Sequence, residues 1–390
     1  EMQRADVEGA LVLGLRPPGE EWHTHPMGPG DVVAAGMPSV GLVRALPYLP
    51  AAFFAVVLLV AWAVIGRAGR RAIALAVRDP ASRAALGWIA AFAIVLPVVM
   101  PLFEPGYYAC HEEESYIVRF EQFRLATRAG VPLGRWWPDP VLGRGYPFLC
   151  FYAPLLYLLG WPLLRFGVYP TAALRWISIL GVFAGAAAVY ALCRRRLGVA
   201  ASLVAVAIYA WAPYLHTDIY TRGDLPEGLG FTTFPLALLA IDRALDGKSP
   251  RADVALVGLG VAGLGVTHAI TSWFSLIFIA LWIGARLVVR SVSRTALTRV
   301  VMGGVLGFAM TVFYALPALV ERPLVRTEML TMGYYTYWKH FTAFAKAMYT
   351  PAPPGPYDMR LDFGVAASAA LGLGLVALVL VIVRRARGDK

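Results

Sequence analysis

His111 is followed directly by three glutamates, Glu112, Glu113 and Glu114, in an otherwise hydrophobic part of the sequence. Each carboxylate would cost about 3 kcal/mol at the centre of a bilayer, so we expect all three in water or in a polar cavity. A carboxylate in a cavity can act as a general base. Glu112 is the leading candidate and Glu113 the second, and His111 could orient either one or assist proton transfer. The alternative is a solvated helix start, where the backbone dipole favours negative charge.

A second group of charges lies in residues 216–228, where Arg222 is followed by Asp224 and Glu227. A guanidinium group can bind a phosphate through two hydrogen bonds, so Arg222 is a candidate for contact with an anionic ligand. The alternative is an Arg222–Asp224 surface ion pair, which contributes little free energy. Glu227 precedes a hydrophobic stretch, where an acidic residue is an ordinary helix cap. It could equally accept a hydrogen bond from a ligand hydroxyl.

Other polar candidates lie further along the chain. His268 falls in a short turn between two hydrophobic stretches. A lone histidine there is usually a hydrogen-bonded structural residue, but polar groups at that depth usually face a cavity. Glu321 and Arg322 begin a later polar loop that contains a Tyr/Trp cluster at 334–340. Basic residues there could bind phosphate and the rings could stack on a ligand, whereas such a cluster is by default a membrane-interface anchor.

The acidic run is predicted to begin an amphipathic helix. Apolar residues recur at the spacing of one helix face, at Tyr116, Ile117, Phe120, Phe123 and Thr127. Gly130 could end this helix. An aromatic and proline-rich run follows over residues 136–152, including Tyr152, and is typical of the membrane–water interface.

The composition is that of a polytopic membrane protein. Of 390 residues, 59% are hydrophobic and 15% charged, and the mean hydropathy is +0.63. The net charge of +11 does not indicate nucleic-acid binding, because the basic residues lie between hydrophobic stretches rather than in one stripe. Lipid headgroups and membrane topology account for them better.

We predict an all-α bundle of about nine transmembrane helices within residues 46–390, preceded by an extramembrane tail over 1–45. The predicted spans run over 48–66, 85–103, 170–193, 197–215, 229–246, 252–268, 270–289, 300–319 and 364–383. His23 and His25 in the tail have no further ligand nearby, so no metal site is predicted there.

Basic residues collect in alternate loops, which the positive-inside rule places in the cytoplasm. The stretch 148–166 is hydrophobic, but it contains Pro154 and Pro162 and is short for a crossing, so we interpret it as a helix along the outer interface. The segments that carry the candidate site residues then share the outer side. They are the first outer loop (104–169), the loop 216–228, the turn at Thr267 and His268, and the last outer loop (320–363). Localisation is therefore predicted to be the plasma or inner membrane.

Three cysteines are too few for a disulfide scaffold and have no zinc-ligand spacing. Cys110 and Cys150 both lie in the first outer loop. A bridge between them is left open, because the sequence does not place their Cα atoms within bonding reach.

Several motifs resemble one family of membrane enzymes. They are His-Glu at 111–112, R-F-E-Q at 119–122, W-x-P-D at 136–139, G-Y-P-F at 145–148, F-Y-x-P-L-x-Y at 151–157, T-R-G-D-L-P-E-G at 221–228 with F-P-L-A-L-L-A at 234–240, T-H-A-I-T-S at 267–272 and A-L-P-A-L-V-E at 315–321. Their order resembles polytopic C-type glycosyltransferases, the GT-C superfamily. The resemblance is closest to the membrane proteins labelled pyruvoyl-tetrahydropterin synthase-related.

This resemblance implies an inverting glycosyltransferase that moves a sugar from a polyprenyl-phosphate donor to an acceptor at the outer face. The family's His-Asp pair would fall on His111 and Glu112, so the acid here is longer, and either Glu112 or Glu113 could take the catalytic position. Arg222, Asp224, Glu227 and His268 would then contact substrate, together with Tyr152, Glu321 and Arg322. Skimming helices after the first loop are also typical of related transferases.

The expected partners are a polyprenyl-phosphate-linked sugar, membrane lipid and an acceptor glycan, lipid or protein. No Walker loop, dinucleotide fingerprint or nucleotide-sugar motif is present, so no nucleotide cofactor is expected, while a divalent cation is left open. Two other classes compete: a non-catalytic lipid-binding subunit and a lipid-linked sugar transporter or flippase. A transporter should show internal repeats and ionisable residues near the midplane, and the sequence shows no convincing repeat.

Overall fold

The computed structural model describes residues 79–386, except for 105, 107, 132, 248, 290–291, 334–335, 337, 339–342, 350–358 and 360. The predicted tail over 1–45 and the first predicted span over 48–66 therefore lie outside the described residues. Most of the predicted Tyr/Trp cluster at 334–340 lies outside them as well.

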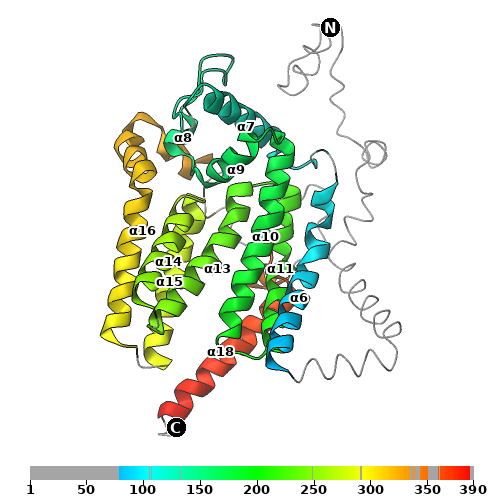
Figure 1. The fold of residues 1–390 in the computed structure, drawn as a ribbon, viewed down its shortest axis with the longest axis vertical. Helices are drawn as coiled ribbons and strands as arrows, with labels where there is room; N and C mark the ends of the chain where they lie inside the picture. The colour runs from blue at the N-terminus through cyan, green and yellow to red at the C-terminus, as the bar shows by residue number, and fades with distance from the viewer. Residues whose placement is uncertain are drawn as a thin grey trace.

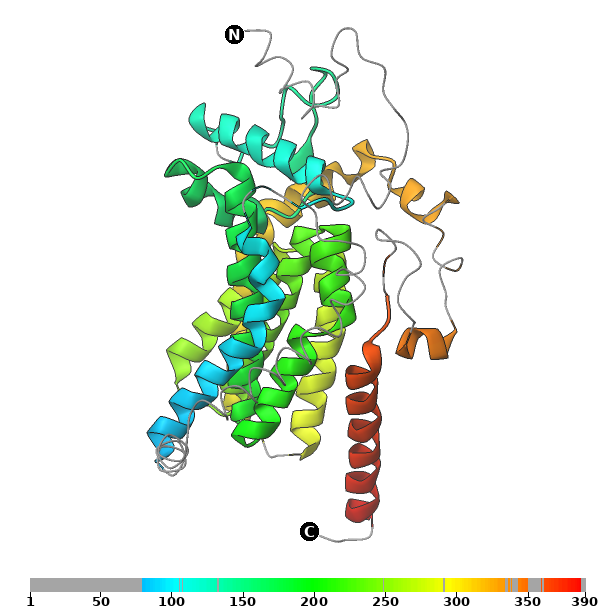
Figure 2. The same ribbon diagram turned by 90° about the vertical axis from the view of Figure 1, so that its right-hand side faces the viewer.

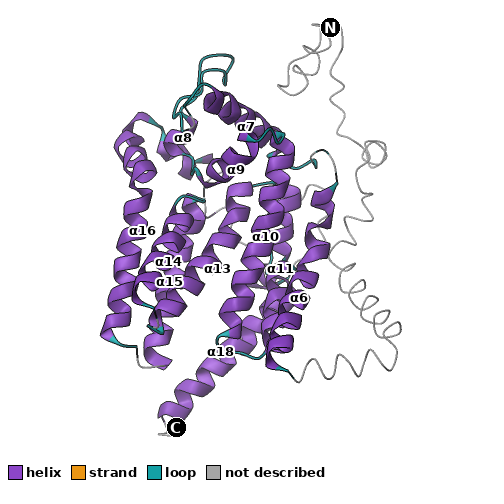
Figure 3. Cartoon of the chain, viewed as in Figure 1, coloured by secondary structure: helices purple, strands orange, loops and turns teal. Residues whose placement is uncertain are grey.

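The described residues form helices and loops, with an isolated β-bridge between Trp137 and Tyr146 (Figure 3). The fold class is therefore all-α, as predicted. Five helical segments are long and apolar enough to cross a membrane. They are Pro80–Phe103 (α6, Pro80–Val99, continued by the 3₁₀ turn η1, Met100–Phe103), Pro170–Arg194 (α10), Leu225–Leu245 (α13), Ala269–Val289 (α15) and Arg294–Leu324 (α16, Arg294–Glu321, continued by η3, Arg322–Leu324). These helices indicate a multi-pass membrane protein.

Eight of the nine predicted spans fall in the described part of the chain, where five helical segments, or six with a bent pair of helices, are long and apolar enough to cross a membrane, so the predicted count is not confirmed. The predicted span at 252–268 forms α14 (Pro250–Gly265), whose 16 residues extend about 24 Å, short of a hydrocarbon core of about 30 Å. The last predicted span corresponds to α18 (Gly364–Ala386), in which Gly364–Ala377 is an apolar stretch below spanning length.

The predicted span at 197–215 corresponds to two helices with a bend between them, which together are long and apolar enough to cross. Helix α11 (Val199–Ala210) ends early because Pro213 disfavours a helical conformation at Ala212, whose backbone is extended (φ −60°, ψ 126°). The chain continues, bent by 44°, as α12 (Pro213–His216) and a π-helical segment, η2 (Thr217–Arg222). Residues 216–228, predicted as a loop, are therefore mostly helical, with α13 beginning at Leu225.

Successive long helices run in alternate directions, so their ends gather at two opposite ends of the bundle (Figures 1 and 2). Buried apolar side chains pack in three groups: α6 with α10 and α11, the α7–α9 region with α10 and α13, and α13 with α14 to α16. We call the end that carries α7 (Glu113–Arg128), α8 (Phe148–Phe151) and α9 (Leu155–Arg165) the α7 end.

Helices α14 and α16 pack closely because glycines lie at their contact. A Cβ atom at Gly303 would stand 2.5 Å from Cβ of Val257, and one at Gly307 would stand 2.7 Å from the carbonyl oxygen of Gly258. Only hydrogen side chains fit there, as in the small-residue interfaces of membrane helices. This pair holds α16, and with it Glu321, against the bundle.

The amphipathic helix agrees with the sequence, whereas the stretch 148–166, predicted as one helix, forms the two short helices α8 and α9. The predicted amphipathic helix is α7, and Gly130 follows it with φ of +81°. Its apolar face is buried through Tyr116, Phe120 and Phe123. Helix α9 has 11 residues, about 16 Å, so it is too short to cross a membrane, and it lies beside α7 across the bundle end (Figure 2).

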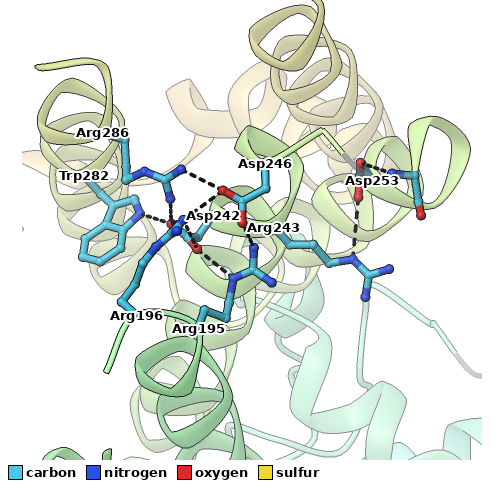
Figure 4. Close-up of polar contacts among 9 residues, drawn as sticks. Arg195, Arg196, Asp242, Arg243, Asp246, Asp253, Trp282 and Arg286 are labelled. Carbon is cyan, nitrogen blue, oxygen red and sulfur yellow. Dashed lines mark hydrogen bonds and ion pairs between the residues drawn. The ribbon is translucent and has the colours of Figure 1, made fainter. Parts of the chain in front are cut away.

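The opposite end, which we call the Asp242 end, is held by ion pairs (Figure 4). The Asp242 side chain is fully buried, and its carboxylate accepts hydrogen bonds from Arg195 (Nε–Oδ2 2.8 Å), from Arg196 and from Arg286. Asp246 pairs with the same three arginines. Among the described residues, Arg195, Arg196, Arg243 and Arg299 from the predicted alternate basic loops therefore lie at one end, as the alternation predicts.

Candidate functional site

The acidic run and the Arg222 segment are joined through their backbones. The amide of His111 donates to the carbonyl of Thr221 (3.0 Å), and the amide of Glu112 donates to the carbonyl of Arg222 (3.1 Å). Gly223 follows with φ of +70°, and a side chain there would collide with Cys110. These contacts place Glu112, at the N-cap of α7, beside the start of α13.

Glu112 lies next to an arginine. Its Oε2 atom is 3.7 Å from NH1 of Arg119, two helical turns along α7, and the Glu112 side chain is 39% exposed. The Arg119 guanidinium lies over the rings of Tyr116, Phe148 and Tyr152, with Cζ 4.8 to 5.2 Å from their centroids. Its NH1 atom is buried and has no hydrogen-bond acceptor in the described chain. The site therefore offers a partly exposed base beside a fixed cation with a spare donor.

Two tyrosines connect Glu112's surroundings to Asp224. The hydroxyl of Tyr116 lies 3.0 Å from that of Tyr152 and donates to Oδ1 of Asp224 (3.1 Å). Burial first, and then the negative charge of Asp224, raises the pKa of Tyr116 well above its usual value and raises the pKa of Tyr152 as well. Both phenols are therefore protonated at neutral pH, as hydrogen-bond donation to a carboxylate requires.

Arg222 is the centre of a partly buried ion-pair cluster. Its NH2 lies 3.0 Å from Oδ2 of Asp224, and its NH1 contacts Glu227 and lies 3.5 Å from Oδ1 of Asp218. The Tyr214 hydroxyl donates to Glu227 (2.7 Å) and accepts from Arg222 (3.1 Å). Arg222 thus pairs with three carboxylates rather than with Asp224 alone, and its side chain remains 30% exposed.

Local backbone structure builds this cluster. Segment η2 is π-helical, and the amide of Gly223 bonds the carbonyl of Asp218 five residues earlier (2.8 Å). Such segments are rare and are frequent at functional sites. Asp224 is the N-cap of α13 and accepts from the Glu227 amide (3.3 Å), so the capping residue is Asp224 and the Glu227 carboxylate is left for Arg222.

Asp224, Glu227 and His268 are placed so that they could hold a metal ion. Each offers one ligand atom, and these atoms lie within 4.8 Å of one another. The same Asp224 and Glu227 oxygens are, however, near Arg222, so a cation would compete with its guanidinium. His268 Nδ1 lies 2.8 Å from Oγ1 of Thr271, a contact that fixes its ring.

Glu321 reaches the same end from α16. Its carboxylate accepts from Arg135 (2.7 Å), and the carbonyl of Arg135 accepts a weak hydrogen bond from the Cys150 thiol (3.6 Å). Tyr314, two turns before Glu321 on α16, donates to the carbonyl of Phe151 (2.9 Å). Cys150 is thus not bridged to Cys110, so the disulfide left open by the sequence is not formed.

The contacts form a continuous path from Glu112 through Arg119, Tyr152, Tyr116, Asp224 and Arg222 to Glu227. His268 is adjacent to the end of that path, and Glu321 lies beside the segment that carries Tyr152. Arg322 is exposed in η3 and has no contact with this path among the described residues. The side chains of Glu113 and Glu114 lie outside the described part.

Sequence reasoning missed Arg119, Tyr116 and Asp218 as site residues. The spacing of Arg119 from Glu112 and Tyr116 places all three on one side of a helix, and this was the available signal. Asp218 is four residues before Arg222, which is also the spacing of one helix face, but the sequence predicts a loop for this segment. The contact between Tyr116 and Asp224 spans 108 positions and has no local signal.

No family model, no curated protein and no solved structure matches this chain.

Proposed function

We propose that this protein is a membrane glycosyltransferase that moves a sugar from a polyprenyl-phosphate donor to an acceptor at the α7 end of the bundle. The observation that carries the proposal is the pairing of Glu112, a partly exposed carboxylate, with Arg119, a cation held among aromatic rings. This is the combination that glycosyl transfer from a phosphate leaving group needs: a base and a positive charge. The GT-C-like motifs of the sequence support the same reaction class.

In the proposed reaction, an acceptor hydroxyl attacks the anomeric carbon of the donor sugar while Glu112 takes its proton. The bond between that carbon and the phosphate oxygen breaks, and the phosphate leaves with the electron pair. Attack from the side opposite the leaving group inverts the anomeric configuration. Arg119 balances the charge that grows on the phosphate, since its guanidinium is partly exposed and its ion pair with Glu112 is long, at 3.7 Å.

The Arg222 cluster has a positioning role in this scheme. Its ion pairs hold Asp224 against Tyr116, and Tyr116 lies under Arg119. Glu227 and His268 stand at the far end of the path, where they are candidates for contact with sugar hydroxyls. The same two side chains with Asp224 are the set that would hold a divalent cation if the reaction used one.

The proposal takes its orientation in the membrane from the sequence. The Asp242 end carries Arg195, Arg196, Arg243, Arg286 and Arg299. In this proposal that end faces the cytoplasm, because its arginines lie in or next to the short turns between spans to which the positive-inside rule applies, and the α7 end, which carries arginines as well, faces outward. A lipid-linked donor would then reach the site from the outer leaflet.

The test is sugar transfer by the purified full chain with candidate polyprenyl-phosphate sugars. Wild type is compared with Glu112→Gln and Glu113→Gln, and with Glu328→Gln, an exposed glutamate in the last loop at the same end. Loss of turnover in Glu112→Gln with retention in Glu328→Gln is expected. Equal turnover in all four proteins would remove the catalytic assignment.

A non-catalytic lipid-binding subunit is the second candidate, and one observation favours it. The buried carboxylates near Arg222 are already ion-paired, an arrangement that serves structure as well as catalysis. Binding of the lipid-linked sugar without turnover, unchanged in Glu112→Gln, would support this second function.

A further inference from the structure

A separate pocket of about 300 Å³ lies between the C-terminal ends of α7 and α9. It is lined by Arg124, Thr127, Arg128, Leu164, Arg165 and Gly167. Its nearest helical turn is 12 residues along α7 from Glu112, about 18 Å at the rise of an α-helix. The pocket is therefore distinct from the site proposed for sugar transfer, and its volume is at the lower end of the range for small-ligand pockets.

The pocket carries uncompensated positive charge. Arg124 is paired with Glu121, whose Oε2 accepts from Arg124 Nε at 2.6 Å. Arg128 and Arg165 are exposed, and neither forms an ion pair within the described chain. Cations at helix C-termini are favoured by the helix dipole, and this alone explains one arginine on each helix. It does not explain why both line the same cavity together with a third.

The arginine side chains, rather than the helix ends, determine that the ligand is an anion. The carbonyl ends of α7 and α9 carry partial negative charge, equivalent to about half an elementary charge each, so the backbone does not attract an anion here. The two full positive charges of Arg128 and Arg165 exceed the partial negative charges of the two helix ends. Guanidinium groups bind phosphate through paired hydrogen bonds, and Leu164 supplies an apolar wall.

Exposed aromatic residues lie close to the pocket residues in the sequence. Phe166, between Arg165 and Gly167, is 87% exposed, and Tyr169, two residues after Gly167, is 81% exposed. Trp161 lies one turn before Arg165 and is also exposed. Large aromatic side chains beside arginines are typical of the headgroup layer of a membrane, where rings sit at the interface and cations meet lipid phosphates.

We propose that this pocket binds the phosphate group of an anionic phospholipid headgroup, with Arg128 and Arg165 as the principal contacts and Arg124 as the third. A headgroup held there would fix α7 and α9 at the membrane surface. The pocket does not share a residue with the sugar-transfer site, so this proposal stands or fails separately from the proposed function.

The test uses the full chain in a neutral detergent, offered equal amounts of phosphatidylglycerol and phosphatidylcholine, with bound lipids counted by native mass spectrometry. Wild type is expected to retain phosphatidylglycerol preferentially. The affinity of the double variant Arg128→Gln/Arg165→Gln for phosphatidylglycerol should be at least about tenfold lower, because each basic residue near an anionic headgroup contributes to the binding free energy. Arg128→Lys/Arg165→Lys should fall between them, since it keeps the charge and loses the paired geometry.

The matched control is Arg144→Gln, which removes an exposed arginine from the same end without touching the pocket and should bind like wild type. Equal binding of both lipids by wild type, or an unchanged preference in the double Gln variant, would overturn the proposal. A second titration uses inorganic phosphate. Binding of inorganic phosphate with no binding of phosphatidylglycerol would also overturn it, because the ligand would then be free phosphate rather than a lipid.

Discussion

The carboxylate of Glu112 and the guanidinium of Arg119 are 3.7 Å apart, on the same side of α7 and two turns from each other. Three aromatic rings hold the guanidinium in place, so its position does not depend on Glu112 alone. A base and a cation fixed this way can act on two atoms of one substrate. This relationship leads to the first prediction.

Arg119→Gln should lower sugar-transfer turnover about a hundredfold, the usual effect of removing one group that stabilises transition-state charge. Arg119→Lys should recover only part of it, because an ammonium group does not stack flat on the rings of Tyr116 and Tyr152. The measurement is kcat and KM with a polyprenyl-phosphate sugar. Full turnover in Arg119→Gln, with Arg144→Gln as the control, would exclude Arg119 from the reaction.

Stability should fall at alkaline pH because of Tyr116. Its pKa is raised above 10.0 in the folded protein by burial and by Asp224, so the native state keeps a proton that the unfolded state loses. The stabilising contribution is therefore complete below pH 10.0 and is lost as pH rises toward the folded pKa. Unfolding followed against pH, with tyrosinate absorbance recorded in parallel, tests this. Tyr116→Phe should show a shallower alkaline loss, and an unchanged slope would contradict the assignment.

Arg222→Gln should destabilise the protein by about 3–5 kcal/mol, the usual cost of leaving buried charges without their partner. Asp218, Asp224 and Glu227 would then face one another with no cation. The measurement is the unfolding free energy in detergent. Adding Glu227→Gln to Arg222→Gln removes one of the stranded charges and should recover part of the loss. If the double variant is no more stable than the single one, the ion-pair account of this cluster is wrong.

Asp242 should be the most sensitive residue at the opposite end. Its fully buried carboxylate neutralises Arg195, Arg196 and Arg286, which come from two other helix ends. Asp242→Asn should cost about 3–5 kcal/mol of unfolding free energy. Asp253→Asn is the comparison, since Asp253 is also fully buried but its pairs with Arg243 and Arg299 are longer, at 3.6 and 3.9 Å. An equal or larger loss in Asp253→Asn would contradict this ranking.

The sequence predicted those features that depend on local spacing. Helix α7, its end at Gly130 and the short α9 follow from apolar periodicity, glycine and proline. Pro213 also signals the bend before it, because proline restricts the conformation of the preceding residue, although hydrophobicity alone predicts a continuous span there. That Arg195, Arg196 and Arg243 meet at one end of the bundle follows from the alternation of the spans.

What could not be predicted depends on contacts between distant residues. Arg222 gains Asp224 and Glu227 from its own segment, but Tyr116 reaches that segment from 108 positions away. The partners of Asp242 on α10 and α15 are likewise set by helix packing. Both Arg222 and Arg119 are therefore paired with carboxylates in the structure, and the sequence shows neither set of partners completely.

The last prediction concerns the contact of α14 with α16. Gly303→Ala should destabilise the protein by about 1–3 kcal/mol, because its Cβ would stand 2.5 Å from Cβ of Val257 and 2.9 Å from the Val254 carbonyl oxygen. The next residue supplies the matched control, since a Cβ at Gly304 meets nothing within 4 Å. Gly304→Ala should be neutral or stabilising by up to about 1 kcal/mol, as alanine is the better helix former. Unfolding free energies in detergent measure both. Equal effects of the two substitutions would mean that the helices separate freely at this point, and that Glu321 is held at the α7 end by its contact with Arg135 rather than by packing of α16.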